Sequence, residues 1–195
     1  MRNRAITDSY EPGSTVKPLV VLSALENRLH KAGDTIDTSP GWLRIGGRRV
    51  SDPRNYGELN LGGILEHSSN VGVTKIALEL GVDPLLQTYF DVGFGNDTGV
   101  SLLGESMGMF GNRRRWSDFE LATLSYGYGL SVTTLQLARA YTAIASGGML
   151  RPLTIFRQES PLPAEQVFSP DNTRAVIRMM ERAVSEGTAK EAQVP

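Results

Sequence analysis

The sequence contains no cysteine and only two histidines, His30 and His67. The absence of cysteine excludes disulfides, thiolate nucleophiles and cysteine-ligated zinc. Two histidines also argue against a histidine-rich metal site. These absences remove several kinds of catalytic and structural centre, but they do not decide between a reducing and an oxidising compartment.

Strong charge and long apolar runs are missing as well. The formal net charge of the 195 residues is −1, which argues against nucleic acid as the main partner because phosphate binding needs clustered positive charge. The longest apolar runs, such as Leu19 to Leu22, are far too short to cross a membrane. No apolar segment of the kind found in signal peptides follows Met1. We therefore expect a single domain whose start is internal to a longer protein.

Helices dominate the pattern of the chain. The stretch 14–27 is apolar nearly all round and predicts a buried helix. Further helices are expected at 61–67, 71–80, 84–92 with Asp83 as N-cap, 119–125, 135–145 and from Ser169-Pro170 to Gly187. Thr133 and Gln136 have the spacing of a capping box. Few strands are evident: a hairpin around Gly46-Gly47 and a strand over 153–156.

A serine lies three residues before a lysine at the start of the first long helix. Residues three apart share one helix face, so the Ser14 hydroxyl and the Lys17 amine are expected to be near each other. An apolar segment follows Lys17, and burial lowers the pKa of a lysine, so that a neutral amine could accept the proton of the serine. The alternative is a helix N-cap at Ser14 and a surface lysine at Lys17, because such a spacing also occurs by chance.

Ser68 and Asn70 lie between two helical stretches. Residues two apart project to the same side in an extended or turn segment. The pair could therefore supply a hydroxyl that relays a proton and an amide that orients a substrate. The alternative is a loop that caps the helix beginning near Val71, since serine and asparagine both favour N-caps. His67 precedes Ser68, but sequence neighbours rarely form a Ser/His pair.

Ser-x-x-Lys followed by Ser-x-Asn resembles two of the three signature motifs of penicillin-binding proteins and serine β-lactamases. Residues 1–8, 11–18, 68–72 and 126–133 resemble class B penicillin-binding proteins, in particular the division-specific septal transpeptidases of Gram-negative bacteria. The resemblance runs nearly from end to end of the chain. It is more specific than either short motif because the order and surroundings of the motifs also match.

The resemblance implies an α/β (α+β) fold of the penicillin-binding transpeptidase and serine β-lactamase type, with an antiparallel sheet between helical layers. Residues 1–195 would form part of the transpeptidase domain, mostly helical and with the sheet truncated. The third motif, Lys-Thr/Ser-Gly, is absent; Gly187-Thr188-Ala189-Lys190 has its lysine after the threonine and follows a helix. In the family this strand contributes an oxyanion donor, so we expect the chain to be inactive unless the remainder is supplied.

The activity that the resemblance implies is D,D-transpeptidation of peptidoglycan stem peptides. Ser14 would be the nucleophile, Lys17 the base that activates it, Ser68 a proton relay and Asn70 a ligand of the substrate backbone. β-Lactams would acylate Ser14 as substrate mimics. No metal or organic cofactor is implied, and division-complex proteins would be the protein partners.

Two other functions stay open from the residues alone. One is a serine β-lactamase, which needs a residue that activates the deacylating water, and none can be assigned. The other is non-catalytic: a β-lactam sensor or a scaffold of a division complex. By resemblance, the whole protein would lie at the periplasmic face of the inner membrane on a single-pass anchor that is absent from these residues.

Overall fold

The computed structural model describes residues 2–111 and 115–193. Its helical segments are α1 (Arg4–Thr7), η1 (Gly13–Val16), α2 (Lys17–Glu26), α3 (Leu61–Glu66), α4 (Asn70–Leu80), α5 (Val82–Asp91), α6 (Asp118–Ser125), α7 (Thr134–Ala145), α8 (Pro170–Ser185) and η2 (Lys190–Ala192). Its strands are β1 (Ser9–Tyr10), β2 (Thr35–Asp37), β3 (Trp42–Ile45), β4 (Arg48–Ser51), β5 (Glu58–Asn60), β6 (Met109–Phe110), β7 (Leu130–Thr133), β8 (Met149–Leu150) and β9 (Glu165–Gln166).

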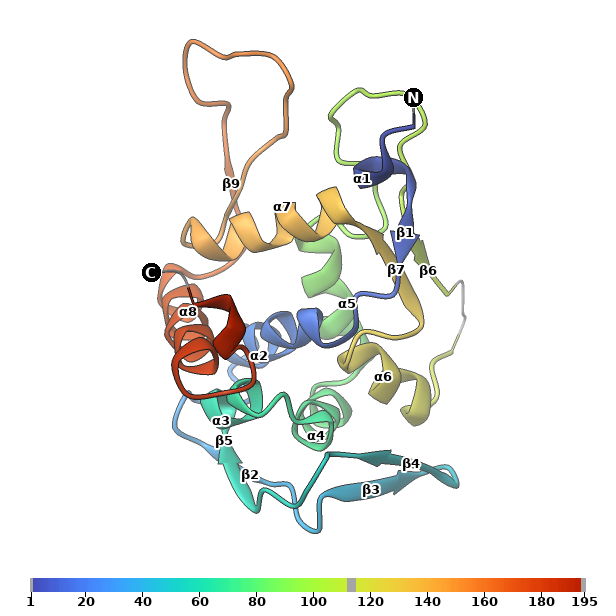
Figure 1. Ribbon diagram of the computed structural model, residues 1–195, viewed down its shortest axis with the longest axis vertical. Coiled ribbons are helices and arrows are strands. Elements are labelled where there is room, and N and C mark those ends of the chain that lie inside the picture. The colour runs from blue at the N-terminus through green and yellow to red at the C-terminus, as the bar shows by residue number, and fades with distance from the viewer. Residues whose placement is uncertain (1, 112–114, 194–195) are drawn as a thin grey trace.

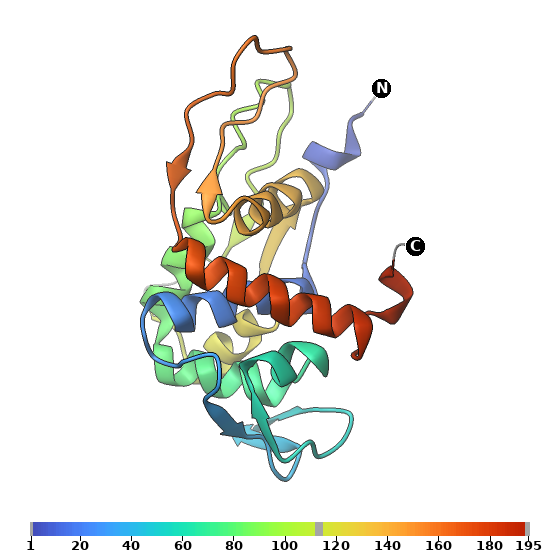
Figure 2. The ribbon, with the colours of Figure 1, turned by 90° about the vertical axis from the view of Figure 1, so that its left-hand side faces the viewer.

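Helix α2 forms the centre of the core. Every residue from Lys17 to Leu25 is buried, and α2 contacts α4, α5 and α8. Figures 1 and 2 show α2 in the middle of the molecule with α8 beside it. The prediction of a buried helix is therefore confirmed, with Pro18 in its first turn, where a missing N–H breaks no hydrogen bond. Within the described ranges, no helix is both long and apolar enough to cross a membrane.

The sheets are small and antiparallel. Strand β7 lies between β1 and β6 in the largest of them, and the remaining strands pair two by two. In the β3–β4 hairpin, Arg44 pairs with Arg49, and the two glycines between the strands have φ of +53° and +83°. Positive φ at both central residues is what a two-residue hairpin of this hand requires. The predicted hairpin and the predicted antiparallel, mostly helical architecture are confirmed.

Local capping signals place several helix starts correctly. Thr133 and Gln136 form the predicted capping box of α7, and Ser169 caps α8 with Pro170 in the first turn. The prediction that Asp83 is an N-cap is wrong. Helix α5 begins at Val82 directly after Gly81, so Asp83 lies inside the first turn, where its carboxylate interacts favourably with the helix dipole.

The predicted strand over 153–156 is also wrong. These residues lie in the long loop that joins β8 to β9, which extends away from the helices in Figure 1. Phe156 N donates to Thr154 Oγ1 at 3.0 Å, a local hydrogen bond that replaces pairing with a neighbouring strand. Ile155 and Phe156 are consequently exposed to solvent.

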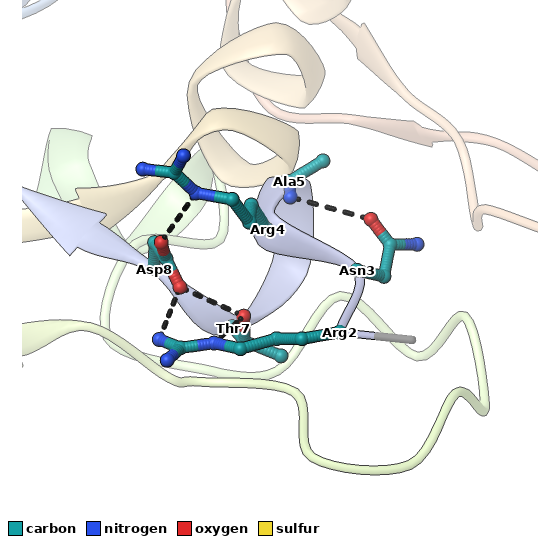
Figure 3. A network of polar contacts seen from close by, with 6 residues as sticks. All are labelled: Arg2, Asn3, Arg4, Ala5, Thr7 and Asp8. Carbon is teal, nitrogen blue, oxygen red and sulfur yellow. Dashed lines mark hydrogen bonds and ion pairs between the residues drawn. The ribbon is translucent and has the colours of Figure 1, made fainter.

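A polar network organises the segment that leads into β1. The Asp8 carboxylate accepts hydrogen bonds from Thr7, from Arg4 at 2.9 Å and from Arg2 (Figure 3). The hydrogen bond from Thr7, followed by that from Arg4, lowers the pKa of Asp8 below its ordinary value. All of these groups lie near solvent, so the network orients the segment more than it stabilises the fold. β1 then pairs with β7 and places the chain just before Ser14 beside the sheet.

Candidate active site

Ser14 lies in the single 3-10 turn that precedes α2. Ser14 is exposed, whereas Val16 and the residues of α2 up to Leu25 are buried. The alternative that Ser14 caps the helix is wrong, because the N-cap of α2 is Val16 and no side chain caps it. The first N–H groups of a helix have no acceptor within the helix. Ser14 therefore presents a hydroxyl at a helix start where backbone donors are available.

Lys17 is buried, with only 2% of the residue exposed. Its amine donates to the Ser68 carbonyl, to Ser68 Oγ at 3.0 Å and to Asn70 Oδ1 at 2.8 Å. These three acceptors match the three donors of an ammonium group. The alternative of a surface lysine is therefore wrong. Within the described residues, no hydrogen bond joins Lys17 Nζ to Ser14 Oγ.

The environment of Lys17 prepares its amine to lose a proton. Burial lowers the pKa of Lys17 from 10.5 to about 8, and the negative charge of Asp52 opposes part of this shift. With a pKa of about 8, about a tenth of the Lys17 amines are neutral at pH 7. A neutral amine has a lone pair that can accept a proton, which a charged ammonium cannot.

Ser68 and Asn70 approach Lys17 from the junction between α3 and α4. Ser68 has a φ of +51°, a conformation that turns the chain sharply before α4 begins. Ser69, not Ser68 or Asn70, caps α4 by accepting from Gly72 N at 2.8 Å. The side chains of Ser68 and Asn70 both reach the same amine, as their spacing predicts. The capping that was the alternative is also present in this loop, but the residue that performs it is Ser69.

Asp52 is a residue of this cluster that sequence reasoning missed. Its carboxylate accepts from Ser69 Oγ at 2.6 Å, from Asn70 N at 2.6 Å and from Val71 N at 3.1 Å. A carboxylate at a helix N-terminus is favourable, and here it fixes the backbone that carries Ser68 and Asn70. Asp52 lies in a turn-rich segment, where acidic residues are common, so no local pattern distinguishes it.

Ser14, Lys17 and Ser68 line one pocket of about 440 Å³. Asn70 joins this group through its hydrogen bond to Lys17. The other walls come from α3, α7, α8 and the segment after α8: Leu65, Tyr141, Met180, Ala183, Val184, Thr188, Ala189 and Ala192, with Thr15 and Pro18 from the start of α2. The pocket is therefore mostly apolar, and Ser14, Lys17 and Ser68 are among its few polar side chains.

In the part of the chain that the structure describes, His67 forms no hydrogen bond with Ser14. Its ring stacks on that of Tyr56, with centroids 4.6 Å apart, and its Nε2 lies 3.8 Å from a Glu66 carboxylate oxygen. The expectation that His67 and Ser68 form no Ser/His pair agrees with this geometry.

An exposed hydroxyl, a buried amine with a lowered pKa and a second hydroxyl around one pocket are typical of serine acyltransferases that use a lysine as base. Residues 1–195 match the family described as the penicillin binding protein transpeptidase domain. The chain belongs to this family, and the resemblance inferred from its motifs is confirmed.

Individual relatives agree with this assignment. The chain is 47% identical over 187 residues to the peptidoglycan D,D-transpeptidase FtsI of Escherichia coli K12, covering 96% of the chain and 32% of FtsI. It is 37% identical over 186 residues to the probable peptidoglycan D,D-transpeptidase PenA of Neisseria gonorrhoeae, covering 95% of the chain and 32% of PenA. The chain thus spans about a third of the length of these curated relatives.

A solved structure shares the fold. The apo transpeptidase domain of Burkholderia pseudomallei penicillin-binding protein 3 superimposes with a TM-score of 0.95 at 41% sequence identity. The match covers 100% of this chain and 60% of that chain. The expected transpeptidase fold is therefore confirmed over the whole of the sequence.

Proposed function

We propose that this chain carries the acyl-transfer centre of a peptidoglycan D,D-transpeptidase that acts in septal cell-wall synthesis during cell division. The observation that carries the proposal is the buried Lys17 amine. This amine has a pKa of about 8 and donates hydrogen bonds to Ser68 and Asn70. Lys17 also lines one pocket together with the exposed Ser14. Membership of the transpeptidase family and the identity to FtsI support the same reaction.

The first half-reaction forms an ester on Ser14. The Ser14 oxygen attacks the carbonyl carbon of the penultimate D-Ala of a stem peptide while its proton passes to the neutral Lys17 amine. The bond to the terminal D-Ala then breaks, and the leaving nitrogen takes a proton through Ser68. The distance of 3.0 Å between Lys17 Nζ and Ser68 Oγ supports this relay.

The second half-reaction resolves the ester. The amine of a second stem peptide attacks the ester carbonyl and loses a proton to the site, and the Ser14 oxygen leaves and recovers a proton. The product is a new amide bond that cross-links two stems. Asn70 would hydrogen-bond the backbone of the bound stem, and the N–H of Ser14 at the helix start would stabilise the oxyanion of each tetrahedral intermediate.

Further parts of the proposal follow from the relatives. β-Lactams would acylate Ser14 because their strained amide mimics the scissile peptide bond. The whole protein would act at the periplasmic face of the inner membrane, beside other proteins of the division complex. These assignments concern the protein at its full natural length, of which the chain represents the Ser14 centre.

Labelling with a fluorescent penicillin tests the proposal in the protein at its full natural length. We expect a stable adduct whose mass maps to Ser14, no adduct in Ser14→Ala, and normal labelling of Ser9→Ala, which alters another exposed serine. Labelling that persists in a folded Ser14→Ala variant would contradict the assignment. Rapid nitrocefin hydrolysis would instead identify a β-lactamase, and a stable adduct without cross-linking of stem peptides would identify a sensor.

A further inference from the structure

Glu11, Gly13 and Thr15, which alternate along the segment around Ser14, each form a hydrogen bond with a distant part of the chain. The Glu11 carboxylate accepts from Gly129 N at 3.0 Å. Gly13 N donates to Gly127 O, also at 3.0 Å. These partners are more than 100 residues away in sequence and belong to the tight turn between α6 and β7. On this side, the chain immediately before Ser14 is fixed by one side-chain hydrogen bond, through Glu11, and one backbone hydrogen bond, through Gly13.

Tyr141 holds the same turn from another helix. Its hydroxyl, at the side of α7 that faces the pocket, donates to the Thr15 carbonyl at 2.8 Å. Burial raises the pKa of Tyr141, so the hydroxyl keeps its proton and remains a donor throughout the pH range in which Lys17 titrates. Thr15 directly follows Ser14, and Tyr141, Ser14 and Lys17 line the same pocket.

The hydrogen bond from Tyr141 to Thr15 can control the orientation of Ser14, because Thr15 is the next residue in the chain. The direction of the Ser14 Oγ and N–H depends on the backbone torsions of residues 13 to 15. Gly13 is fixed by its bond to Gly127, and the carbonyl of Thr15 is fixed by Tyr141. Ser14 itself therefore lies between two tethered peptide units, and its side chain is free to face the pocket.

We propose that Tyr141 is a positioning residue for the nucleophile: its hydrogen bond to the Thr15 carbonyl fixes the orientation of Ser14 towards Lys17 and towards the bound acyl donor. The inference rests on the proposed function, in which Ser14 attacks. Tyr141 exchanges no proton with substrate. A small displacement of a nucleophile can lower a rate about 100-fold, so loss of this tether should appear in the acylation step.

The test compares two phenylalanine variants in the protein at its full natural length. Tyr141→Phe removes the tether and retains the ring that lines the pocket. Tyr89→Phe is the matched control, because the Tyr89 hydroxyl donates to another backbone carbonyl, that of Leu124, at 3.0 Å. Stopped-flow measurement with a fluorescent penicillin separates non-covalent binding from the acylation rate constant.

For Tyr141→Phe we expect an acylation rate constant roughly 10- to 100-fold lower, with the non-covalent dissociation constant changed less than about threefold. Tyr89→Phe should acylate at the wild-type rate. The pH at which the rate is half-maximal should be the same in Tyr141→Phe as in the wild type. Equal acylation rates in the two variants, or a displaced pH profile in Tyr141→Phe, would overturn the positioning role.

Two further measurements separate this inference from the proposed function. An adduct that forms in Ser14→Ala would refute the function, whatever Tyr141→Phe does. Independently of catalysis, the ¹³C′ resonance of Thr15 and the ¹⁵N resonance of Val16 report the hydrogen bond to the Thr15 carbonyl. Both should shift in Tyr141→Phe and stay in place in Tyr89→Phe, and unshifted resonances in Tyr141→Phe would refute the tether itself.

Discussion

The pH dependence of Ser14 acylation should follow the titration of Lys17. With a pKa of about 8, roughly 10% of the amines are neutral at pH 7, compared with about 0.03% for a lysine at its ordinary value of 10.5, a difference of about 300-fold. Raising the pH removes the proton, so the rate should rise with pH. We expect a rate that is half-maximal near pH 8, levels off above pH 9 and falls about tenfold between pH 7 and pH 6.

Replacing Asp52 should change the pKa of Lys17 in a direction that can be stated in advance. Its negative charge raises the pKa of Lys17, so Asp52→Asn should lower that pKa and move the acid limb of the profile to lower pH. The plateau can also fall, because asparagine holds Ser69, Asn70 and Val71 less well than a carboxylate does. The direction in which the limb moves does not depend on the height of the plateau, so the two effects can be read separately.

The assay is the acylation rate constant of a fluorescent penicillin between pH 5.5 and 9.5. Lys17→Arg, which stays charged throughout this range, should abolish acylation. Lys75→Arg, at a half-buried lysine of α4 that donates to the Asp37 carbonyl, should leave the profile unchanged. A rate that is constant down to pH 5.5 would refute the assignment of Lys17 as base. A limb that moves to higher pH in Asp52→Asn would refute the electrostatic account of its pKa.

Gly127→Ala should destabilise the protein by more than about 2 kcal/mol in thermal unfolding, because its Cβ would lie 2.0 Å from Gly13 O. Gly99→Ala, also at positive φ but with nothing within 4 Å, should lose only about 1 kcal/mol, and equal losses would contradict the packing argument. Gln136→Ala should destabilise the protein by about 1–3 kcal/mol, because Gln136 Nε2 donates to backbone carbonyls at both ends of the loop 96–107. Amide hydrogen exchange in residues 96–107 should also become faster. Unchanged exchange in this loop would refute the role of Gln136.

Features encoded by neighbouring residues could be predicted from the sequence. The capping box of Thr133 and Gln136, the Ser169-Pro170 helix start and the hairpin at Gly46-Gly47 each depend on a few adjacent residues, and all are confirmed. The strand predicted over 153–156 failed because the identity of a strand depends on a partner, which a short apolar run does not specify.

In the candidate site too, some residues could be predicted from their neighbours in the sequence and others could not. The spacing of Ser14 and Lys17 and that of Ser68 and Asn70 are visible in the sequence, although the bonds between the two pairs span more than 50 residues. Asp52 lies 17 residues or more from the groups it binds, and nothing in its neighbourhood indicates that it faces a helix N-terminus. Supporting residues of this kind are determined by how the elements pack.

The long-range tethers of the Ser14 turn have a consequence for folding. Its contacts with Gly127, Gly129 and Tyr141 join parts of the chain separated by 114 to 126 residues, and closing such loops is slow. The Ser14 turn can therefore reach its final geometry only after α6, α7 and α2 have docked. During refolding, reactivity towards a penicillin should recover later than helical circular dichroism. If Ser14 is acylated as proposed, its labelling would report the last stage of assembly.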